Sequence, residues 1–158
     1  MTLVTSDVLD AREDAKVCMI ALRLLGRKRA IAGRIRTVRC CEDNALVKAA
    51  MAERSKGEVL VVDGGGSLRT ALMGDMVAGA GCASGWAGAI VFGAVRDSVA
   101  LDALEFHVKM LGTNPRKSAK TGAGERDVVV EVGGIRFVPG EYVYSDDDGV
   151  VVVAEQIP

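Results

Sequence analysis

The sequence predicts an α/β fold, with a mixed sheet and flanking helices in a single domain over residues 1–158. Two short apolar runs, at residues 59–62 and 89–93, are bounded by turn signals, which is typical of strands buried on both faces. Helical patterns separate these runs from each other and from a strand predicted at residues 106–110, which gives β-α-β-α-β spacing. With 158 residues, 49% of them apolar, the chain suffices for one hydrophobic core.

The N-terminal part is predicted to hold helices and one strand. Residues 5–25 have a mixed apolar pattern that indicates one or two short helices. Alternating and β-branched residues predict a strand over residues 32–40. Asp43 or Asn44 is then suited to cap a helix that runs to Ala52, because short polar side chains accept hydrogen bonds from the first helical amides.

The segments between the apolar runs are predicted as a turn and further helices. The sequence Asp-Gly-Gly-Gly at residues 63–66 resembles a phosphate-binding loop, but no Gly-Lys-Ser/Thr follows, so we interpret it as a tight turn. Residues 68–72 are expected to form a short helical turn, and residues 74–84 a longer helix. Ser98 is expected to cap another short helix that ends at Leu104.

The last third of the chain changes to short strands. A polar, basic loop is expected over residues 112–126. The strands that follow it are separated by Gly-Gly, Pro-Gly and Asp-Gly turns. They are predicted at residues 128–132, 135–138, 142–144 and 150–153.

The charge balance excludes a general polyanion binder. Twenty Lys and Arg residues against 21 Asp and Glu leave a net charge of −1, and 4% aromatic residues provide few surfaces for base stacking, so direct nucleic-acid binding is not expected. The charges are nevertheless unevenly spread. Residues 15–41 carry eight basic residues and no acid, while residues 141–158 carry five acids and no base. Either these segments neutralise each other within or between subunits, or they form a patch for RNA or a protein partner.

The sequence is that expected of a cytoplasmic protein with no membrane contact. Its four cysteines form no Cys-x-x-Cys pair, and acidic residues occupy the first twenty positions, where a signal peptide would be basic and then apolar. Residues 76–95 carry no charge over the length of a membrane span, but 11 of these 20 residues are Gly or Ala and a Ser-Gly turn divides them. We interpret this stretch as a helix, a turn and a buried strand.

Two short motifs are candidates for chemistry: Gly74-Asp75 at the start of a predicted helix, and Arg96-Asp97 at the end of a predicted strand. Both would face the crevice beyond the carboxyl ends of the strands. Free amides at the helix start would hold a substrate carboxylate, and Arg96 would clamp the substrate and stabilise an enolate oxygen. The substrate-binding candidates are Gly74, Asp75, Met76, Val77 and Arg96.

Asp97 is the candidate ligand for Mg²⁺ or Mn²⁺, and Asp75 would orient or deprotonate a water molecule. The catalytic candidates are therefore Asp75 and Arg96. A purely structural alternative remains open, in which Arg96-Asp97 is a solvated ion pair and Asp75 only stabilises the helix dipole. The single histidine, His107, lies in a strand pattern and is expected to be packed, which argues against zinc chemistry.

Several motifs in this order resemble one protein family over nearly the whole chain. The segments that carry the resemblance are Val38-Arg39-Cys40 with Glu42-Asp43-Asn44, residues 59–67, Gly93-Ala94-Val95-Arg96-Asp97, residues 112–118 and Tyr144-Ser145-Asp146-Asp147-Asp148-Gly149. The chain resembles the regulator of ribonuclease E activity A proteins and the related 4-hydroxy-4-methyl-2-oxoglutarate aldolases. In the aldolase branch an Asp is followed after 20 residues by Arg-Asp, which matches Asp75, Arg96 and Asp97.

The resemblance implies a swivelling β/β/α fold, a homotrimer, and a metal-dependent class II pyruvate aldolase that also decarboxylates oxaloacetate. It implies a small 2-oxo acid substrate at residues 74–77 and Arg96, and a divalent metal at Asp97. The aldolases also carry a longer C-terminal region that supplies an acidic residue to the neighbouring subunit's site, and Glu155 is the candidate for that role here. The alternative implied by the same resemblance is a non-catalytic regulator that binds and inhibits a ribonuclease E-type partner.

Overall fold

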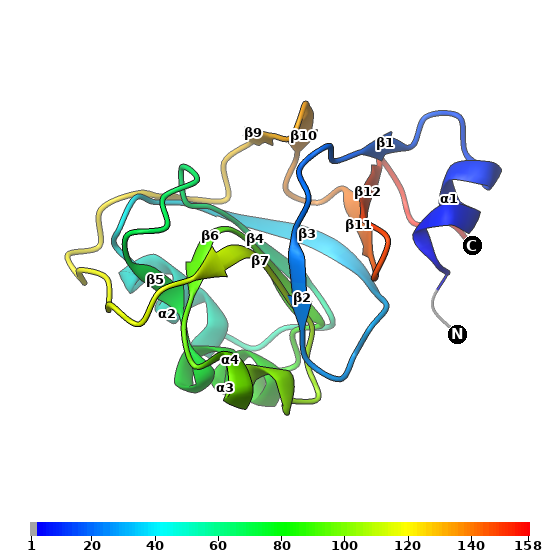
Figure 1. The fold of residues 1–158 in the computed structure, drawn as a ribbon. Helices are drawn as coiled ribbons and strands as arrows, with labels where there is room; N and C mark the ends of the chain where they lie inside the picture. Colours follow the sequence, from blue (N-terminus) through cyan, green and yellow to red (C-terminus); the bar gives the residue numbers. More distant parts are fainter. Residues whose placement is uncertain (1–2) are drawn as a thin grey trace.

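The computed structural model describes residues 3–158 and shows a mixed α/β fold (Figure 1). The predicted domain also includes residues 1–2, which lie outside the described residues. Ten strands form the main sheet, whose path is β1-β12-β11-β3-β4-β6-β7-β2, with β5 paired to β6 and β8 paired to β3. Strands β9 and β10 form a separate two-stranded sheet. The elements are α1 (Thr5–Ala11), β1 (Lys16–Val17), β2 (Arg23–Leu25), β3 (Ile31–Arg39), α2 (Ala45–Ala52), β4 (Val59–Asp63), β5 (Ala71–Met73), α3 (Asp75–Ser84), β6 (Gly88–Val95), α4 (Ser98–Asp102), β7 (Val108–Thr113), β8 (Glu125–Arg126), β9 (Val130–Val132), β10 (Ile135–Phe137), β11 (Tyr142–Ser145) and β12 (Val150–Val153).

The centre of the sheet is parallel and covered on both faces, as the continuous apolar runs predicted. Strands β3, β4, β6 and β7 are parallel neighbours, and all eight residues of β6 are buried. Along β4, Leu60 and Val62 pack in the cluster formed with α2, α3 and α4, while Val59 and Val61 pack in the cluster on the opposite face. Helices α2, α3 and α4 gather on one face of the sheet (Figure 1). The parallel strands therefore end along one edge, where β5 and β6 lead into α3 and α4.

The N-terminal part differs from the prediction of helices over residues 5–25. Only α1 is helical there, and the following residues form β1, which pairs with β12, and β2, which pairs with β7. Both pairings are antiparallel and join segments from distant parts of the chain. The partner strands complete the sheet at these positions, so tertiary pairing outweighs the local helical tendency.

The predicted helical turn at residues 68–72 is also wrong, because β5 occupies this position. Its three residues are all buried, and it runs parallel to the end of β6, with Ala71 opposite Ala94 and Met73 opposite Val95. A strand this short has too few residues to show a period of its own. Its place is determined by the hydrogen bonds that β6 offers.

Other boundaries shift by a few residues. Helix α4 ends at Asp102, and its N-cap is Asp97 in place of Ser98. Strand β7 runs over residues 108–113 where residues 106–110 were predicted, β9 begins at Val130, and β8 lies inside the predicted loop 112–126. The predicted strand at residues 32–40, the helix ending at Ala52 and the strands near the C-terminus are confirmed within two residues.

The glycine-rich segment at residues 63–66 forms the predicted tight turn. Gly65 and Gly66 have positive φ angles of 67° and 77°, which glycine adopts without strain. The Gly65 N–H donates to the Asp63 carboxylate, and the Gly66 N–H donates to the carbonyl oxygen of Phe92. These two backbone donors are therefore committed within the turn and to β6.

Ion pairs inside the chain neutralise much of the basic segment 15–41. Arg29 pairs with Asp147, which joins this segment to the acidic C-terminal part. The other basic residues that form ion pairs in this segment have acidic partners elsewhere in the chain; they are Arg27 with Glu105, Arg36 with Asp127 and Glu58, and Arg39 with Glu125 and Asp63. The predicted neutralisation of this segment by residues 141–158 is therefore confirmed for Arg29, whereas the other three arginines are neutralised by acids outside that range. Among residues 3–158, no helix is both long and apolar enough to cross a membrane.

His107 is packed in the core, as predicted from its strand pattern. Its side chain is 0% exposed, its Nδ1–H donates to the carbonyl oxygen of Lys28 at 2.7 Å, and its Nε2 accepts from the Ser145 hydroxyl at 2.9 Å. Burial lowers the pKa of His107 to about 4, and the positive charges of Lys109 and Arg29 act in the same direction. Both ring nitrogens form hydrogen bonds when the imidazole is neutral. The fold therefore favours the neutral form of His107 over the protonated form.

We expect the buried histidine to make the fold weaker in mild acid. The unfolded chain takes up a proton near pH 6.5, whereas the folded chain does so only near pH 4, so the free energy of unfolding should fall by about 1.4 kcal/mol per pH unit between these values. Urea unfolding followed by Trp86 fluorescence at pH 7.5 and pH 4.5 would measure this loss. His107→Gln should remove most of the slope, and an unchanged slope in that variant would contradict the assignment.

Candidate active site

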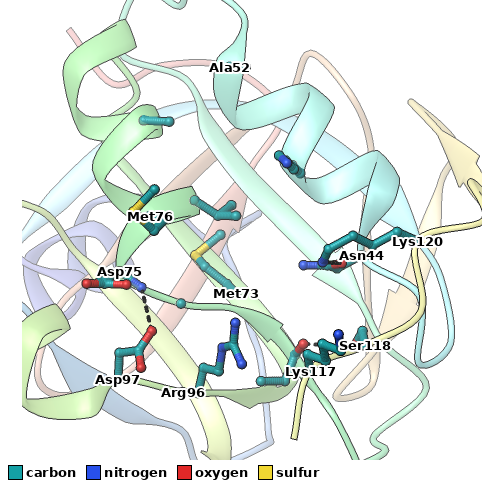
Figure 2. A pocket seen from close by; sticks show the side chains of 15 residues that line it. Asn44, Ala52, Met73, Asp75, Met76, Arg96, Asp97, Lys117, Ser118 and Lys120 are labelled. Atoms are coloured by element: carbon teal, nitrogen blue, oxygen red, sulfur yellow. Dashed lines mark hydrogen bonds between the residues drawn. The ribbon is translucent and has the colours of Figure 1, made fainter. Parts of the chain in front are cut away.

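The two predicted motifs lie together at the carboxyl edge of the parallel strands. Helix α3 begins at Asp75, directly after β5, and Arg96-Asp97 directly follows β6. The Arg96 N–H donates to the Met73 carbonyl oxygen at 2.9 Å, which fixes the ends of the two strands side by side. The Asp75 N–H donates to Asp97 Oδ2 at 3.2 Å, the hydrogen bond drawn in Figure 2. The start of α3 and the carboxylate of Asp97 therefore form one local unit.

This unit lies on a cavity of about 440 Å³. Four cationic side chains and two carboxylates line the cavity, so its excess charge is positive, although the chain carries −1 overall. Apolar side chains from α2, β5 and α3 also line it, among them Ala52, Met73 and Met76 (Figure 2). The lining residues are Asn44, Lys48, Ala52, Ala71, Met73, Gly74, Asp75, Met76, Val77, Ala80, Arg96, Asp97, Lys117, Ser118 and Lys120. A small organic anion matches this volume and charge.

Asp97 has an unusual backbone conformation for a residue other than glycine. Its φ and ψ angles are 60° and 44°, in the left-handed region, where Asp and Asn are better tolerated than other side chains. Its carbonyl oxygen accepts the Leu101 N–H at the start of α4, and its Oδ2 accepts the Asp75 N–H. Among residues 3–158, Asp97 forms no ion pair, so its second carboxylate oxygen is available to a ligand.

Arg96 is also available to a ligand. Its backbone is fixed between the ends of β5 and β6, and its one side-chain hydrogen bond within residues 3–158 is a long one, from Nη1 to the Pro115 carbonyl oxygen at 3.5 Å. No carboxylate of the described residues forms an ion pair with it, so the alternative of an Arg96-Asp97 ion pair is not what the structure shows. A guanidinium without an anionic partner at a cavity wall is suited to bind a carboxylate or a developing oxyanion.

Gly74 lets Asp97 approach the start of α3. A Cβ atom at this position would lie 2.6 Å from Asp97 Oδ2, closer than atoms pack, and in a tight contact of 3.2 Å with Arg96 Cγ. The backbone of Gly74 is extended, with φ −135° and ψ −166°, so the need is for space and not for an unusual conformation. Of the first-turn amides of α3, that of Asp75 donates to Asp97, which leaves those of Met76 and Val77 facing no intrahelical acceptor.

The donor set fits a hard divalent cation that keeps most of its water. Among residues 3–158, no group of three or more His, Cys, Asp or Glu side chains is placed to hold a metal ion. The carboxylates that line the cavity are Asp75 and Asp97, and Mg²⁺ or Mn²⁺ is often held by only one or two carboxylates together with water and substrate. The free oxygen of Asp97 matches that requirement, whereas a zinc-type ligand set does not occur here.

Sequence reasoning missed the side of the cavity opposite Asp97. Lys48 and Asn44 come from α2 and the residue before it, and Lys117, Ser118 and Lys120 come from a segment we name the strap, residues 114–126. The sequence shows the basic composition of this segment, but no sequence pattern indicates its position over the cavity. Figure 2 shows Lys120 reaching toward Asn44, and its Nζ donates to Asn44 Oδ1 at 2.9 Å.

The strap is held as an extended segment between two parts of the chain. On one side, the Ala119 N–H donates to Glu42 O and the Asn44 N–H donates to Ala119 O, each at 3.0 Å. On the other side, Ala71 donates its N–H to Arg116 O at 2.7 Å and accepts from the Ser118 hydroxyl at 2.7 Å. The strap therefore continues the edge of the sheet and carries its lysines into the cavity.

Asp43 fastens the strap to the start of α2. It is 4% exposed, its Oδ2 accepts from the N–H and the hydroxyl of Thr121, and its Oδ1 accepts from the N–H groups of Gly122 and Ala45. The hydroxyl of Thr121, followed by these backbone donors, lowers the pKa of Asp43 to about 2. A charged carboxylate with four donors is a strong anchor, although it lines no part of the cavity.

We expect Asp43→Asn to loosen the strap while leaving the fold intact. An asparagine amide would turn two N–H donors toward Thr121, Gly122 or Ala45, where the aspartate accepts hydrogen bonds. Amide exchange at residues 119–122 should become faster, and the affinity of the cavity for oxalate should fall by roughly tenfold. Hydrogen exchange followed by mass spectrometry, together with calorimetry, would measure both.

The matched control for this substitution is Asp147→Asn, which removes an exposed carboxylate far from the strap in sequence. Asp147→Asn should change neither the amide exchange at residues 119–122 nor the affinity of the cavity for oxalate. Unchanged exchange at Thr121 in Asp43→Asn would contradict the anchoring role. The anchor should also weaken in acid, because a carboxylate whose folded pKa is depressed stabilises the fold above its unfolded value of 3.8 and loses that contribution as the pH falls toward 2.

The chain is similar in sequence and in structure to known proteins. The model of one protein family, described as RraA-like (aldolase/RraA), matches residues 5–152. A structure from Geobacillus kaustophilus, described as an S-adenosylmethionine:2-dimethylmenaquinone methyltransferase, is 46% identical, has a TM-score of 0.96, and the match covers 98% of this chain and 97% of that chain. The RNA-processing inhibitor RraA from Thermus thermophilus is 40% identical with a TM-score of 0.96, and the match covers 100% of this chain and 96% of that chain.

A more distant relative has the same fold over less of its length. It is a Streptomyces coelicolor protein described as an unusual member of the RNase ES inhibitor RraA protein family, which is 32% identical with a TM-score of 0.73, covering 88% of this chain and 72% of that chain. These matches confirm the family and the fold that the sequence motifs predicted.

Proposed function

The chain belongs to the RraA-like family, and we propose that it is a divalent-metal-dependent lyase that releases pyruvate from short 2-oxo acids. The proposed reactions are cleavage of 4-hydroxy-4-methyl-2-oxoglutarate and decarboxylation of oxaloacetate. The observation that carries the proposal is the positively charged cavity in which the start of α3, Arg96 and Asp97 meet. Each is free of an ion-pair partner within residues 3–158, so the site is ready for an anionic substrate.

Each residue has a defined task in this proposal. The free amides of Met76 and Val77 bind the carboxylate next to the 2-oxo group, with the favourable dipole of α3 behind them. Arg96 donates to the 2-oxo oxygen, where negative charge develops as the enolate forms. Asp97 would hold Mg²⁺ or Mn²⁺, which supplies Lewis-acid stabilisation of that oxygen when bound.

Both reactions break the bond between C3 and C4 and leave its electron pair on the pyruvate enolate. From oxaloacetate the other product is CO₂, and from 4-hydroxy-4-methyl-2-oxoglutarate it is a second pyruvate, formed after the 4-hydroxyl loses its proton. Asp75 lies at the rim of the same cavity and would accept that proton through a water molecule. A proton returned to C3 of the enolate completes the first pyruvate.

The lysines opposite Asp97 support a substrate with two carboxylates. Lys48, Lys117 and Lys120 line the cavity and form no ion pair among residues 3–158. Lys120 is oriented by Asn44, so one of these charges has a fixed position. A dianion with one carboxylate at α3 and the other at the lysines would satisfy both walls, and both proposed substrates are such dianions.

A second candidate function rests on the relatives. The Thermus and Streptomyces proteins are described as inhibitors of RNA processing or of RNase ES, and the first of them matches the full length of this chain. In this alternative the chain is a non-catalytic inhibitor that binds a ribonuclease E-type partner through the surface of a homotrimer. The exposed Arg27, Lys28 and Arg29 are the residues whose charge reversal would test such a surface.

The deciding experiment measures pyruvate release from oxaloacetate and from 4-hydroxy-4-methyl-2-oxoglutarate, with Mg²⁺ or Mn²⁺ and with EDTA. Release that requires the metal and exceeds the rate of metal alone would support the lyase. No release from either substrate would refute it. Capture of a ribonuclease from lysate at low salt, lost on charge reversal at residues 27–29, would then support the inhibitor.

A further inference from the structure

We propose that the chain has a second anion site, separate from the cavity at Asp97, which binds a phosphate group between Arg34, Arg54 and Lys56. These three side chains line a hollow of about 500 Å³ together with Tyr142 and Gln156. The hollow lies at the opposite end of the parallel strands, because residues 54–58 directly precede β4. None of its lining residues belongs to the lining of the cavity at Asp97.

The cationic side chains of this hollow are not neutralised by acidic side chains of residues 3–158. Arg34, Arg54 and Lys56 are exposed and form no ion pair within residues 3–158. The next arginines of the same strand behave differently, since Arg36 pairs with Asp127 and Glu58, and Arg39 pairs with Glu125. The arginine of β3 that lines the hollow is therefore the one that has no ion-pair partner among residues 3–158.

The one acid in the hollow does not neutralise these cations. Glu58 Oε1 accepts from the Ser55 hydroxyl at 3.0 Å, and Glu58 Oε2 lies 3.7 Å from Nη1 of Arg36. Both carboxylate oxygens are thus directed to partners outside the cationic set. The three cations retain a local excess of positive charge in a chain whose net charge is −1.

The connection that carries Arg54 and Lys56 has a fixed backbone. The N–H groups of Ser55 and Gly57 donate to the carbonyl oxygens of Ser84 and Gly85, each at 2.9 Å. The indole of Trp86 donates to the carbonyl oxygen of Glu53, also at 2.9 Å. A loop tied at three points to the end of α3 holds its side-chain origins in place, which lowers the entropic cost of binding.

Arg34 and Tyr142 complete the hollow from the sheet. They are directly opposite each other in the antiparallel pairing of β3 with β11. The guanidinium of Arg34 is oriented by one hydrogen bond, from Nη1 to the Gly140 carbonyl oxygen at 3.1 Å, so the rest of its fork is free. Tyr142 also lines the hollow, where its hydroxyl adds a neutral donor beside the cations.

A phosphate group suits this arrangement better than a carboxylate. The guanidinium forks of Arg34 on β3 and Arg54 before β4 line one hollow with the ammonium of Lys56. Such a set of donors matches the several oxygens and double negative charge of phosphate. The volume of the hollow leaves room for a small organic group attached to the phosphate, which would pack against the ring of Tyr142. The ligand is therefore inorganic phosphate or the phosphate of a small metabolite such as a nucleoside monophosphate.

The test compares binding of inorganic phosphate and of adenosine monophosphate, by calorimetry at low salt, in the full chain and its variants. The double variant Arg54→Met with Lys56→Met should weaken binding of both by roughly tenfold or more, because it removes two of the three charged donors. Arg23→Met removes an exposed, unpaired charge on β2 and should leave affinity unchanged. Lys120→Met tests the other cavity, and the binding that is lost in the double variant should be unchanged by it.

Three outcomes would overturn the proposal. Equal weakening by Arg23→Met would mean a diffuse charge effect, and weakening by Lys120→Met alone would assign phosphate to the cavity at Asp97. Affinity that grows with the length of an oligoribonucleotide and far exceeds that of adenosine monophosphate would assign the surface to RNA. Tighter binding of adenosine monophosphate than of phosphate, lost in the double variant, would support the proposal and identify the source of the phosphate group.

Discussion

Asp97→Ala is expected to abolish metal-dependent release of pyruvate, with a loss of at least roughly a thousandfold. Asp97 is the carboxylate at the cavity that has both a fixed position, through the Asp75 N–H, and an oxygen free for a cation. Among residues 3–158 no group of three or more potential ligands is placed to hold a metal ion, so the loss of Asp97 should leave Asp75 as the one carboxylate that lines the cavity. The measurement is the rate of pyruvate formation with Mg²⁺ and with EDTA.

Asp97→Asn separates charge from conformation in this experiment. Asn tolerates the left-handed backbone of position 97 and can still accept the Asp75 N–H, whereas Ala does neither. If the negative charge carries the function, both variants lose activity, and only Ala also lowers the free energy of unfolding. Full activity in Asp97→Asn would contradict a role in metal binding. Because Mg²⁺ and Mn²⁺ alone decarboxylate oxaloacetate slowly, the metal without protein is the necessary blank.

The buried strands were predictable because their own residues are apolar on both faces. In β4 and β6 every position that faces either cluster is apolar, so the pattern does not depend on a partner. Strands β2 and β5 have three residues each, and their structure comes from β7 and β6, to which they pair. The sequence carries no local signal for such segments, and the prediction assigned both to helix. Pairing partners distant in sequence decided these positions.

One side of the candidate site was predictable for a similar reason, whereas the opposite side was not. Residues that end one parallel strand and begin the next helix meet at one edge, which brings Asp75, Arg96 and Asp97 together without knowledge of any side-chain contact. The lysines opposite them depend on the strap. Its path is set by the bonds of Thr121 to Asp43, 78 residues earlier in the chain, and no periodicity reveals such a contact.

Gly74→Ala is expected to cost roughly a hundredfold or more in pyruvate release while the fold persists. The added Cβ would lie 2.6 Å from Asp97 Oδ2, and the carboxylate, at the end of an exposed side chain, is the group that gives way. It would move from the start of α3 and lose the Asp75 N–H, whereas the extended backbone of Gly74 accepts alanine without strain. Steady-state kinetics and urea unfolding would show a large loss of kcat with a small change in stability.

Gly79→Ala, in the same helix, is the matched control for Gly74→Ala. A Cβ at Gly79 meets no atom within 4 Å, and its φ angle is not positive, so alanine should stabilise α3 by about 0.5–1 kcal/mol through its better helix propensity and leave the rate unchanged. The pair of substitutions thus makes the same chemical change with opposite expected consequences. If both variants kept full activity, the contact of Asp97 with the start of α3 would have no catalytic role, and the proposed reaction would have to proceed without that arrangement.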